Sequence, residues 1–261
     1  MYPFGVLVRL TNRIKWQAKL RLNSCGIYKF KDYQDNELVR TIVEKGLSHR
    51  VSLHTNRELS SAELRSASIL GFMPDKEALS VLDFGGGTGN LHPVAQIVFP
   101  GKTFKWVVVE TPELCRQAKK LIPEADLEFA SSISVANQKF SGVIDVAILG
   151  SSLQYTLEPL VTLKEILELK PNFIWITKTP VTKTNFPIQT FQRSRLTDNG
   201  PGKSSGTFSN REVEYPITIC PITSLEGLLL KDYEIIFKLD EGPFSLNGKE
   251  HQLKGYFCGK K

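Results

Sequence analysis

The sequence predicts an α/β fold in which helices cover both faces of a mostly parallel sheet. From residue 79 onward, short β-rich runs alternate with stretches long enough for crossover helices, a pattern typical of parallel sheets. The last two β runs, at 232–239 and 253–259, have no helix between them, which predicts an antiparallel pair at one edge. We therefore expect a seven-stranded sheet preceded by an N-terminal helical segment.

The individual elements follow from these patterns. The first five β runs are expected at 79–84, 104–110, 126–130, 143–150 and 173–179, and the crossover helices at 89–98, 112–121 and 158–169. Before the sheet, residues 35–47 and 60–72 look helical. The second of these segments begins with Ser60 and Glu63 at the spacing of a reciprocal N-terminal cap, and Pro74 ends it.

Three regions are expected along the chain: a basic N-terminal segment at 1–34, a helical cap at 35–78 and the main domain at 79–261. Within the main domain, residues 180–216 lack the alternation of strands and helices and are rich in Gly, Ser, Thr and Asn near their centre. A connection of this length is typical of a lid or an insertion over a binding site.

Charge is concentrated at the N-terminus. The chain has 33 Lys+Arg, 27 Asp+Glu and a net charge of +6. Residues 1–31 hold seven basic residues and no acidic ones, so the remainder is almost neutral. This distribution disfavours a protein that coats nucleic acid, which would carry a basic face on its folded part. An apolar stripe in 1–31 predicts a helix that either lies on an anionic membrane surface or packs on the body.

The remaining composition points to a cytoplasmic protein, with the inner membrane face as a possible docking surface for 1–31. No apolar run approaches the ~20 residues that cross a bilayer. The four cysteines lie far apart and form no cluster with histidine, which predicts free thiols and no metal site.

The sharpest local signal is the glycine-rich run Asp83-Phe84-Gly85-Gly86-Gly87-Thr88-Gly89, directly after the first strong β run. A dinucleotide loop would need a glycine where Asn90 stands, and a P-loop would end in Gly-Lys-Ser/Thr. The pattern D-x-G-x-G-x-G instead resembles the first motif of Rossmann-like S-adenosylmethionine (SAM) methyltransferases. The resemblance implies that Asp83, Gly85, Gly86, Gly87 and Gly89 bind SAM, whose ammonium and sulfonium suit a nearby acid.

Further positions follow from this resemblance. The second β run ends in Glu110, which could accept hydrogen bonds from both ribose hydroxyls. The end of the third run, at Ser131 and Ser132, is expected to form the adenine pocket. Gly150, at the end of the fourth run, is expected to contact the cofactor.

Later motifs narrow the resemblance. The chain is similar, over about residues 25–261, to a bacterial family of SAM methyltransferases associated with surface-polysaccharide, O-antigen-type biosynthesis. The resemblance rests on LGSSLQY (149–155), Glu158-Pro159, TKTP (177–180), TFQ (190–192), Tyr215-Pro216 and GYF (255–257). It implies O-methylation of a sugar, a lipid-linked glycan or another small-molecule acceptor.

Candidate residues for the chemistry should lie at the carboxyl ends of the strands, where open α/β sheets bind ligands. Tyr155, Gln154 and Tyr215 are the catalytic candidates, and Thr179 and Gln192 are expected to contact the acceptor. A glutamine can orient an acceptor but cannot remove its proton, so no catalytic base is assigned. His92, one turn after the glycines, either contacts the methionine part of SAM or is an ordinary helix residue.

Two alternatives remain open at this stage. One is an RNA methyltransferase that uses the basic arm, and the other is a non-catalytic partner protein with a SAM-binding fold. The fourth run is not followed by the Asp/Asn-Pro-Pro-aromatic turn typical of nucleic-acid amino-methyltransferases, nor by a Pro-Cys nucleophile. Nucleic acid is therefore the less favoured partner.

Overall fold

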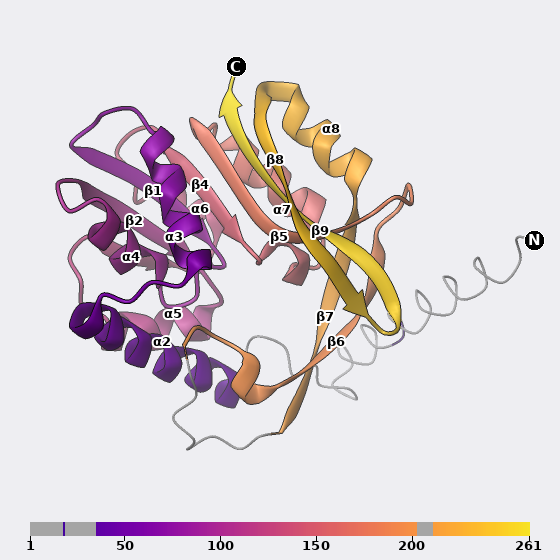
Figure 1. The fold of residues 1–261 in the computed structure, drawn as a ribbon, viewed down its shortest axis with the longest axis horizontal. Helices are drawn as coiled ribbons and strands as arrows, with labels where there is room; N and C mark the ends of the chain where they lie inside the picture. Colours follow the sequence, from indigo (N-terminus) through magenta and orange to yellow (C-terminus); the bar gives the residue numbers. More distant parts are fainter. Residues whose placement is uncertain (1–17, 19–34, 203–210) are drawn as a thin grey trace, which may run out of the picture.

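The structure is a computed structural model, and it describes residues 35–202 and 211–261 together with residue 18 (Figure 1). The basic segment at 1–31 therefore lies outside the described residues, apart from that one position. The same holds for 203–210, in the middle of the expected lid or insertion. Within the described parts, no helix is long and apolar enough to cross a membrane.

Five parallel strands form the centre of the sheet in the order β3-β2-β1-β4-β5. They are β1 (Ala78–Phe84), β2 (Thr103–Val109), β3 (Leu127–Ala130), β4 (Val146–Gly150) and β5 (Phe173–Thr182). Next to β5 lies the antiparallel strand β9 (Lys249–Lys260), which pairs in turn with β8 (Tyr233–Leu246). The predicted mostly parallel sheet with an antiparallel edge pair is thus confirmed, but the described sheet has nine strands rather than the predicted seven, because a hairpin at 188–221 also joins it beside β5.

Apolar side chains alternate between the two faces of the sheet, so each face supports its own core. On β2, Trp106 and Val108 belong to one core, whereas Val107 and Val109 belong to the other. The first core packs under α2 (Asn36–Asn56), the turn η1 (Ile69–Phe72), α4 (Leu91–Val98) and α5 (Pro112–Leu121). The second packs under α6 (Ile133–Asn137), α7 (Pro159–Glu168) and α8 (Ile222–Asp232), giving the three layers of Figure 1.

The helices before the sheet show why they begin and end where they do. The Asp35 side chain caps α2, and Arg57, with φ 52°, ends it. The helix continues past the predicted end at 47 because its last turns also pack on the body, through the buried side chains of Arg50 and Leu53. The predicted reciprocal cap is present in α3 (Ser61–Ser68): Ser60 Oγ accepts from Glu63 N–H at 3.2 Å, and Glu63 Oε2 accepts from Ser60 N–H at 2.8 Å.

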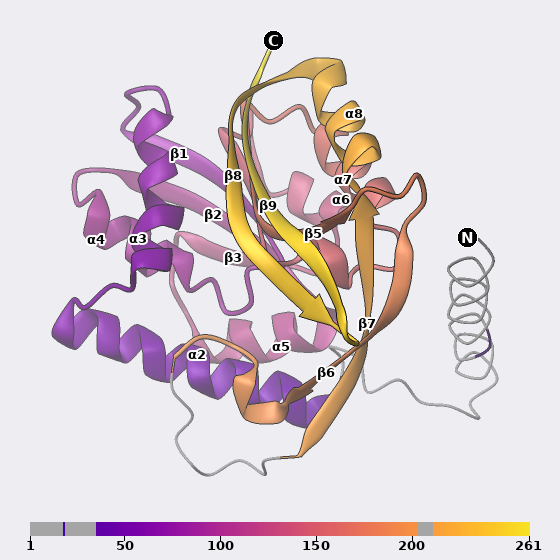
Figure 2. The ribbon, with the colours of Figure 1, turned by 45° about the vertical axis from the view of Figure 1, so that its right-hand side comes forward.

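The region 180–216 contains an antiparallel hairpin inserted after β5. Its strands are β6 (Ile188–Arg195) and β7 (Glu212–Pro221), with the short turn η3 (Leu196–Asp198) after β6. Alternate residues of β7 are buried, including Val213, Tyr215 and Ile217, which explains why this strand is stable. Figure 2 shows the hairpin reaching from the edge of the sheet toward α2.

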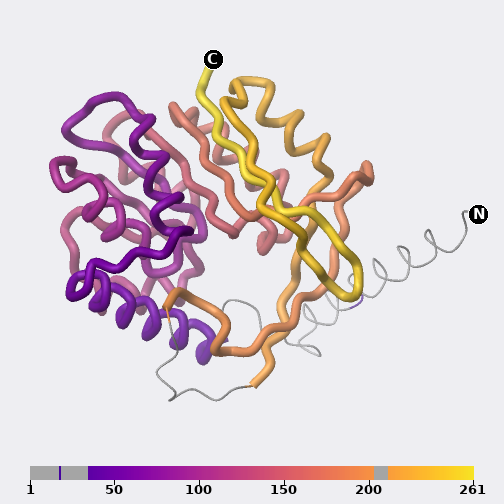
Figure 3. The backbone as a smooth tube through the Cα atoms, in the orientation of Figure 1, coloured from indigo at the N-terminus to yellow at the C-terminus, as the bar shows by residue number. Residues whose placement is uncertain are grey.

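The connection after β6 lies against α2, as the backbone trace in Figure 3 shows. Lys45 of α2 donates to the carbonyl of Thr197 at 2.7 Å. Gly200 approaches so closely that a Cβ there would lie 3.1 Å from the Ile42 Cα. The inserted segment and the first helix therefore meet above the carboxyl ends of the strands.

Candidate functional site

A cleft of about 840 Å³ lies over the carboxyl ends of β1, β2, β4 and β5. The strand order reverses between β1 and β4, and open α/β sheets bind ligands at such a point. One wall comes from α2 and α3, and the opposite wall comes from β6, the residues after it and Tyr215 of β7. The volume falls in the range of small-molecule pockets.

The glycine turn after β1 supplies the floor of the cleft. Gly85 and Gly87 have φ of 69° and 61°, the left-handed region in which side chains are strained. A Cβ at Gly86 would lie 2.2 Å from Asp83 Oδ2, so only glycine fits there. These three glycines line the cleft, whereas Gly89 packs behind it, where a Cβ would lie 2.9 Å from Leu127 Cδ1.

Two acidic residues line the cleft beside this turn. Asp83 accepts a hydrogen bond from Trp106 Nε1 at 3.1 Å, and burial raises its pKa to about 7. The Glu110 carboxylate accepts from the N–H groups of Gly87, at 3.1 Å, and Thr111, at 3.0 Å. Burial raises the pKa of Glu110 as well, and these two backbone bonds oppose the rise.

The tyrosines predicted for the chemistry meet on the lid side of the cleft. The rings of Tyr155 and Tyr215 pack edge to face, with centroids 5.5 Å apart. Tyr155 Oη donates to Gln192 Oε1 at 3.3 Å, and Tyr215 Oη donates to Ser194 Oγ at 3.1 Å. All four residues line the cleft, and so does Gly150.

Other predicted site residues lie outside the lining. Gln154 is buried behind it and donates to Ser151 Oγ at 3.3 Å and to the Lys178 carbonyl at 3.4 Å. Thr179 is fully buried within β5. Ser131 and Ser132 are exposed after β3, and Ser132 caps α6 by accepting from Val135 N–H at 3.2 Å.

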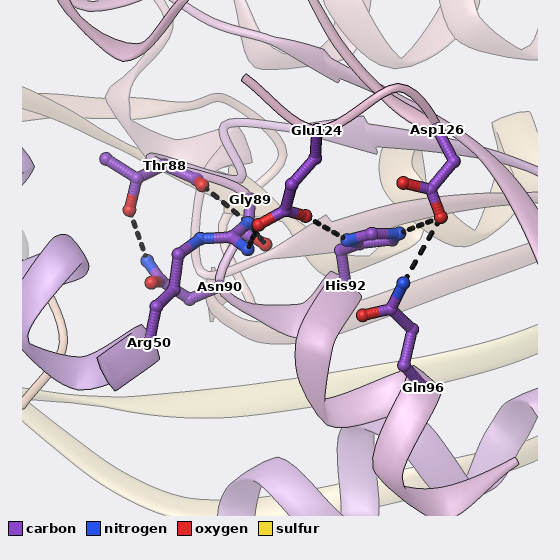
Figure 4. A network of polar contacts seen from close by, with 8 residues as sticks. All are labelled: Arg50, Thr88, Gly89, Asn90, His92, Gln96, Glu124 and Asp126. Carbon is purple, nitrogen blue, oxygen red and sulfur yellow. Dashed lines mark hydrogen bonds and ion pairs between the residues drawn. The ribbon is translucent and has the colours of Figure 1, made fainter. Parts of the chain in front are cut away.

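The first helix holds the glycine turn from behind, through residues that sequence reasoning missed. A Cβ at Gly46 would lie 2.0 Å from Thr88 Oγ1, so α2 rests directly on the turn. Arg50 Nη2 donates to the carbonyls of Thr88, at 3.1 Å, and Gly89, at 2.6 Å (Figure 4). The available signal was Gly46 itself, because a glycine inside a helix often marks a close packing contact.

Arg50 continues into a network around His92, which is fully buried and does not line the cleft. Arg50 Nη1 donates to Glu124 at 2.7 Å, and the His92 Nδ1 and Nε2 atoms lie 3.0 Å from Glu124 Oε2 and Asp126 Oδ2. Among the described residues, His92, Glu124 and Asp126 are close enough to hold a metal ion. Their arrangement is that of a linear network, because the two ring nitrogens face different carboxylates (Figure 4).

No family model matches the chain, and no curated protein matches it. Solved structures that resemble it include the N-terminal domain of EvdMO1 with S-adenosylhomocysteine (SAH) bound. That domain is 13% identical over 79% of this chain and 84% of that chain, with a TM-score of 0.46. A SAM-dependent methyltransferase from Methanosarcina mazei is 14% identical over 74% and 96% of the two chains, with a TM-score of 0.47. One from Clostridium acetobutylicum is 12% identical over 82% and 97%, also with a TM-score of 0.47. At these TM-scores the structural similarity does not assign a function. The functional assignment therefore depends on the residues of the site.

Proposed function

We propose that this chain is a SAM-dependent methyltransferase that O-methylates a sugar or a lipid-linked glycan. The proposal rests on one observation: the D-x-G-x-G-x-G turn and Glu110 line the same cleft, and the Gly87 N–H donates a hydrogen bond to the Glu110 carboxylate. A turn of bare backbone beside two carboxylates suits a ligand with a cationic end and ribose hydroxyls. A pyrophosphate at the turn, in contrast, would be repelled by Asp83.

The residues present fit SAM. The turn leaves room for a ligand at Gly87, where an added Cβ would meet only Ile42 Cγ2, 4.0 Å away. Asn90, which lines the cleft, has a buried Oδ1 with no hydrogen-bond partner among the described residues. Glu110 would hold the ribose hydroxyls, and Asp83 would favour the positive charge. When bound, SAM supplies a methyl group on a positively charged sulfur.

The acceptor side of the cleft suits a sugar. Tyr155 offers ring surface to the apolar face of a pyranose, and the buried Tyr215 ring packs edge to face against it, whereas Gln192 and Ser194 offer polar atoms to the hydroxyls of the sugar. Gln192 can orient a hydroxyl, and Tyr155, which donates to Gln192, can accept a hydrogen bond from the acceptor. Holding the acceptor in line is itself worth about 7–11 kcal/mol in well-oriented reactions.

Gln154 and Thr179 have a supporting role in this proposal. Both lie behind the lining, and Gln154 bonds the loop after β4 to the Lys178 carbonyl of β5. They would fix the positions of the residues that contact the acceptor. In the same way, Ser131 and Ser132 would bound the adenine end from the end of β3, next to Glu110.

The division of the chain forms part of the proposal. Residues 79–261 would bind the cofactor, 35–78 would cap it, and 1–31 would attach the enzyme to the anionic inner membrane surface near a lipid-linked acceptor. Deletion of 1–31 is expected to reduce binding to vesicles containing phosphatidylglycerol and to leave SAH affinity unchanged. Loss of SAH binding in the truncated protein would contradict this division.

Calorimetric titration with SAH tests the cofactor assignment. The wild-type protein is expected to bind SAH, and Glu110→Gln to weaken binding about tenfold or more, because charged hydrogen bonds to the ribose are lost. Glu113→Gln is the matched control, since Glu113 lies on α5 outside the cleft and pairs with Arg116. A wild-type protein that binds no SAH would refute the assignment.

A further inference from the structure

Strand β5 contains a bulge at the edge of the cleft. Its pairing with β9 shifts between Ile176 and Thr179, so Thr177 and Lys178 together oppose Gly255. Lys178 has φ 50°, a left-handed conformation that is unusual for a lysine within a strand. Bulges next to binding sites often redirect a side chain, and strained backbone persists only where its surroundings hold it.

Residues far away in the sequence hold this bulge in place. The Lys178 N–H donates to Glu241 Oε2 of β8, and the Glu241 side chain is almost fully buried. Arg65 of α3 pairs with the other oxygen of Glu241 at 3.0 Å. At Gly255, a Cβ would lie 3.0 Å from Glu241 Oε2 and 3.1 Å from the Ile176 carbonyl oxygen, so the bulge leaves little room for a side chain there.

The bulge places one more residue of β5 on the cleft. In a regular strand, alternate side chains face opposite sides, so Trp175 and Thr177 would share a face and Lys178 would point away. In the structure, all three line the cleft. The distortion therefore presents a lysine to the ligand.

Trp175 and Lys178 both offer hydrogen-bond donors. Trp175 Nε1 is buried and has no hydrogen-bond partner among the described residues, and an indole can only donate. Lys178 lines the cleft and is exposed, and no described acidic side chain pairs with its ammonium group. Arg193, the other cation lining the described cleft, is near Glu214, with Nε and Oε1 3.4 Å apart.

The acids on the cleft are engaged elsewhere, and Asp83 accepts its bond from the Trp106 indole. Glu63 receives hydrogen bonds from Ser60 and contacts His49, and Glu110 receives bonds from Gly87 and Thr111. Asp198 accepts from the Arg195 N–H at 3.3 Å. The Trp175 N–H and the Lys178 ammonium group are thus available to a ligand group that only accepts hydrogen bonds.

We propose that Lys178 and the Trp175 indole N–H form a subsite for an oxyanion, a carboxylate or phosphate group of the bound ligands. Two sources carry this chemistry: the methionyl carboxylate of SAM, or an anionic group on the acceptor, such as a sugar phosphate. The inference rests on the proposed function and makes it more specific, since this part of the cleft would favour a negatively charged group on the ligand.

Binding experiments with Lys178→Gln and three probes separate the two sources. The probes are SAH, 5′-methylthioadenosine, which lacks the amino-acid part, and inorganic phosphate, followed by calorimetry and ³¹P NMR. Lys183→Gln is the matched control because Lys183 follows β5 outside the cleft, and Lys178→Arg should retain binding. Trp175→Phe removes the second donor and keeps the ring.

An acceptor subsite is supported if phosphate binds the SAH-saturated protein and binds Lys178→Gln at least about tenfold more weakly. The other source is supported if Lys178→Gln lowers SAH affinity tenfold and leaves methylthioadenosine affinity unchanged, and if phosphate competes with SAH. Lys178 would then bind the carboxylate of the cofactor. The proposal is overturned if Lys178→Gln matches Lys183→Gln for both SAH and phosphate. A wild-type protein that binds phosphate through Lys178 but neither nucleoside would refute the proposed function and retain the oxyanion subsite.

Discussion

Gly87 donates its backbone N–H to the Glu110 carboxylate at 3.1 Å, which joins the turn after β1 to the end of β2. Gly87 has φ 61°, a left-handed conformation that glycine adopts without strain. The carboxylate is therefore positioned before any ligand arrives, with Thr111 N–H holding its second oxygen. Such preorganisation lowers the cost of binding, because no side chain has to be ordered at that moment.

Gly86→Ala should disrupt this turn. The new Cβ would lie 2.2 Å from Asp83 Oδ2, and relief of the clash must move the buried carboxylate or the backbone. We expect a loss of about 1–3 kcal/mol in the free energy of unfolding, measured in urea, together with weaker SAH binding. Gly101→Ala is the control, since nothing lies within 4 Å of a Cβ there. Equal stability of the two variants would show that the turn adapts freely.

The buried Asp83 should make stability depend on pH. Its pKa is about 7 in the folded protein against an ordinary 3.8, so the folded state binds the proton more tightly. The free energy of unfolding should therefore fall as pH rises from about 4 to about 7, by up to about 1.4 kcal/mol per pH unit. Asp83→Asn should reduce this slope, whereas Asp75→Asn, at an exposed position, should not. Urea unfolding at pH 5, 6 and 7 gives the slopes, and identical slopes for Asp83→Asn and the wild type would contradict the effect.

Arg50→Met should loosen the contact between α2 and the glycine turn. The substitution keeps an apolar stem but removes the guanidinium from Glu124 and from the carbonyls of Thr88 and Gly89. Because the Arg50 side chain is only 5% exposed, we expect a loss of about 2–4 kcal/mol in urea unfolding. Arg40→Met, on the solvent face of the same helix, should change nothing measurable. An unchanged free energy of unfolding in Arg50→Met would mean that water replaces the guanidinium.

Tyr215→Phe should weaken the wall formed by the hairpin. The buried hydroxyl donates to Ser194 Oγ at 3.1 Å, and its removal should cost about 1 kcal/mol in thermal unfolding. In the Tyr215→Phe background, Ser194→Ala should add less than it does alone, since the two substitutions share the Tyr215–Ser194 bond, and each also removes one contact to Asn199. Full additivity of the two substitutions would show that the bond contributes nothing to stability.

The central sheet was predictable because its signals are local. Each parallel strand is a short run of buried apolar residues, such as Trp106 to Val109, and the crossover helices are bounded by Pro112 and Pro159. The glycine turn was predictable for the same reason, since its chemistry depends on neighbouring residues. The cap at Ser60 and Glu63 also depends on a spacing of three residues.

The remaining parts of the site depend on contacts between distant segments. The exposure of Lys178 to the cleft requires Gly255 and Glu241, which are more than sixty positions away. The hold of Arg50 on the glycine turn likewise depends on the direction of α2. No local pattern contains this information. Gln154 follows β4 as predicted, whereas Thr179, predicted to follow the fifth strand, lies within β5, which continues to Thr182. Both side chains are buried behind the lining of the cleft, a position that depends on how distant segments pack.

The most direct test of the account is methyl transfer from tritiated SAM to a cell lysate by the purified full-length protein, followed by separation into glycan, lipid, RNA and protein fractions. Label is expected in the glycan or lipid-linked glycan fraction, and Glu110→Gln should lower the rate at subsaturating SAM. Label in RNA alone would contradict the proposed acceptor. SAH binding without labelling of any fraction would contradict the proposed methyl transfer.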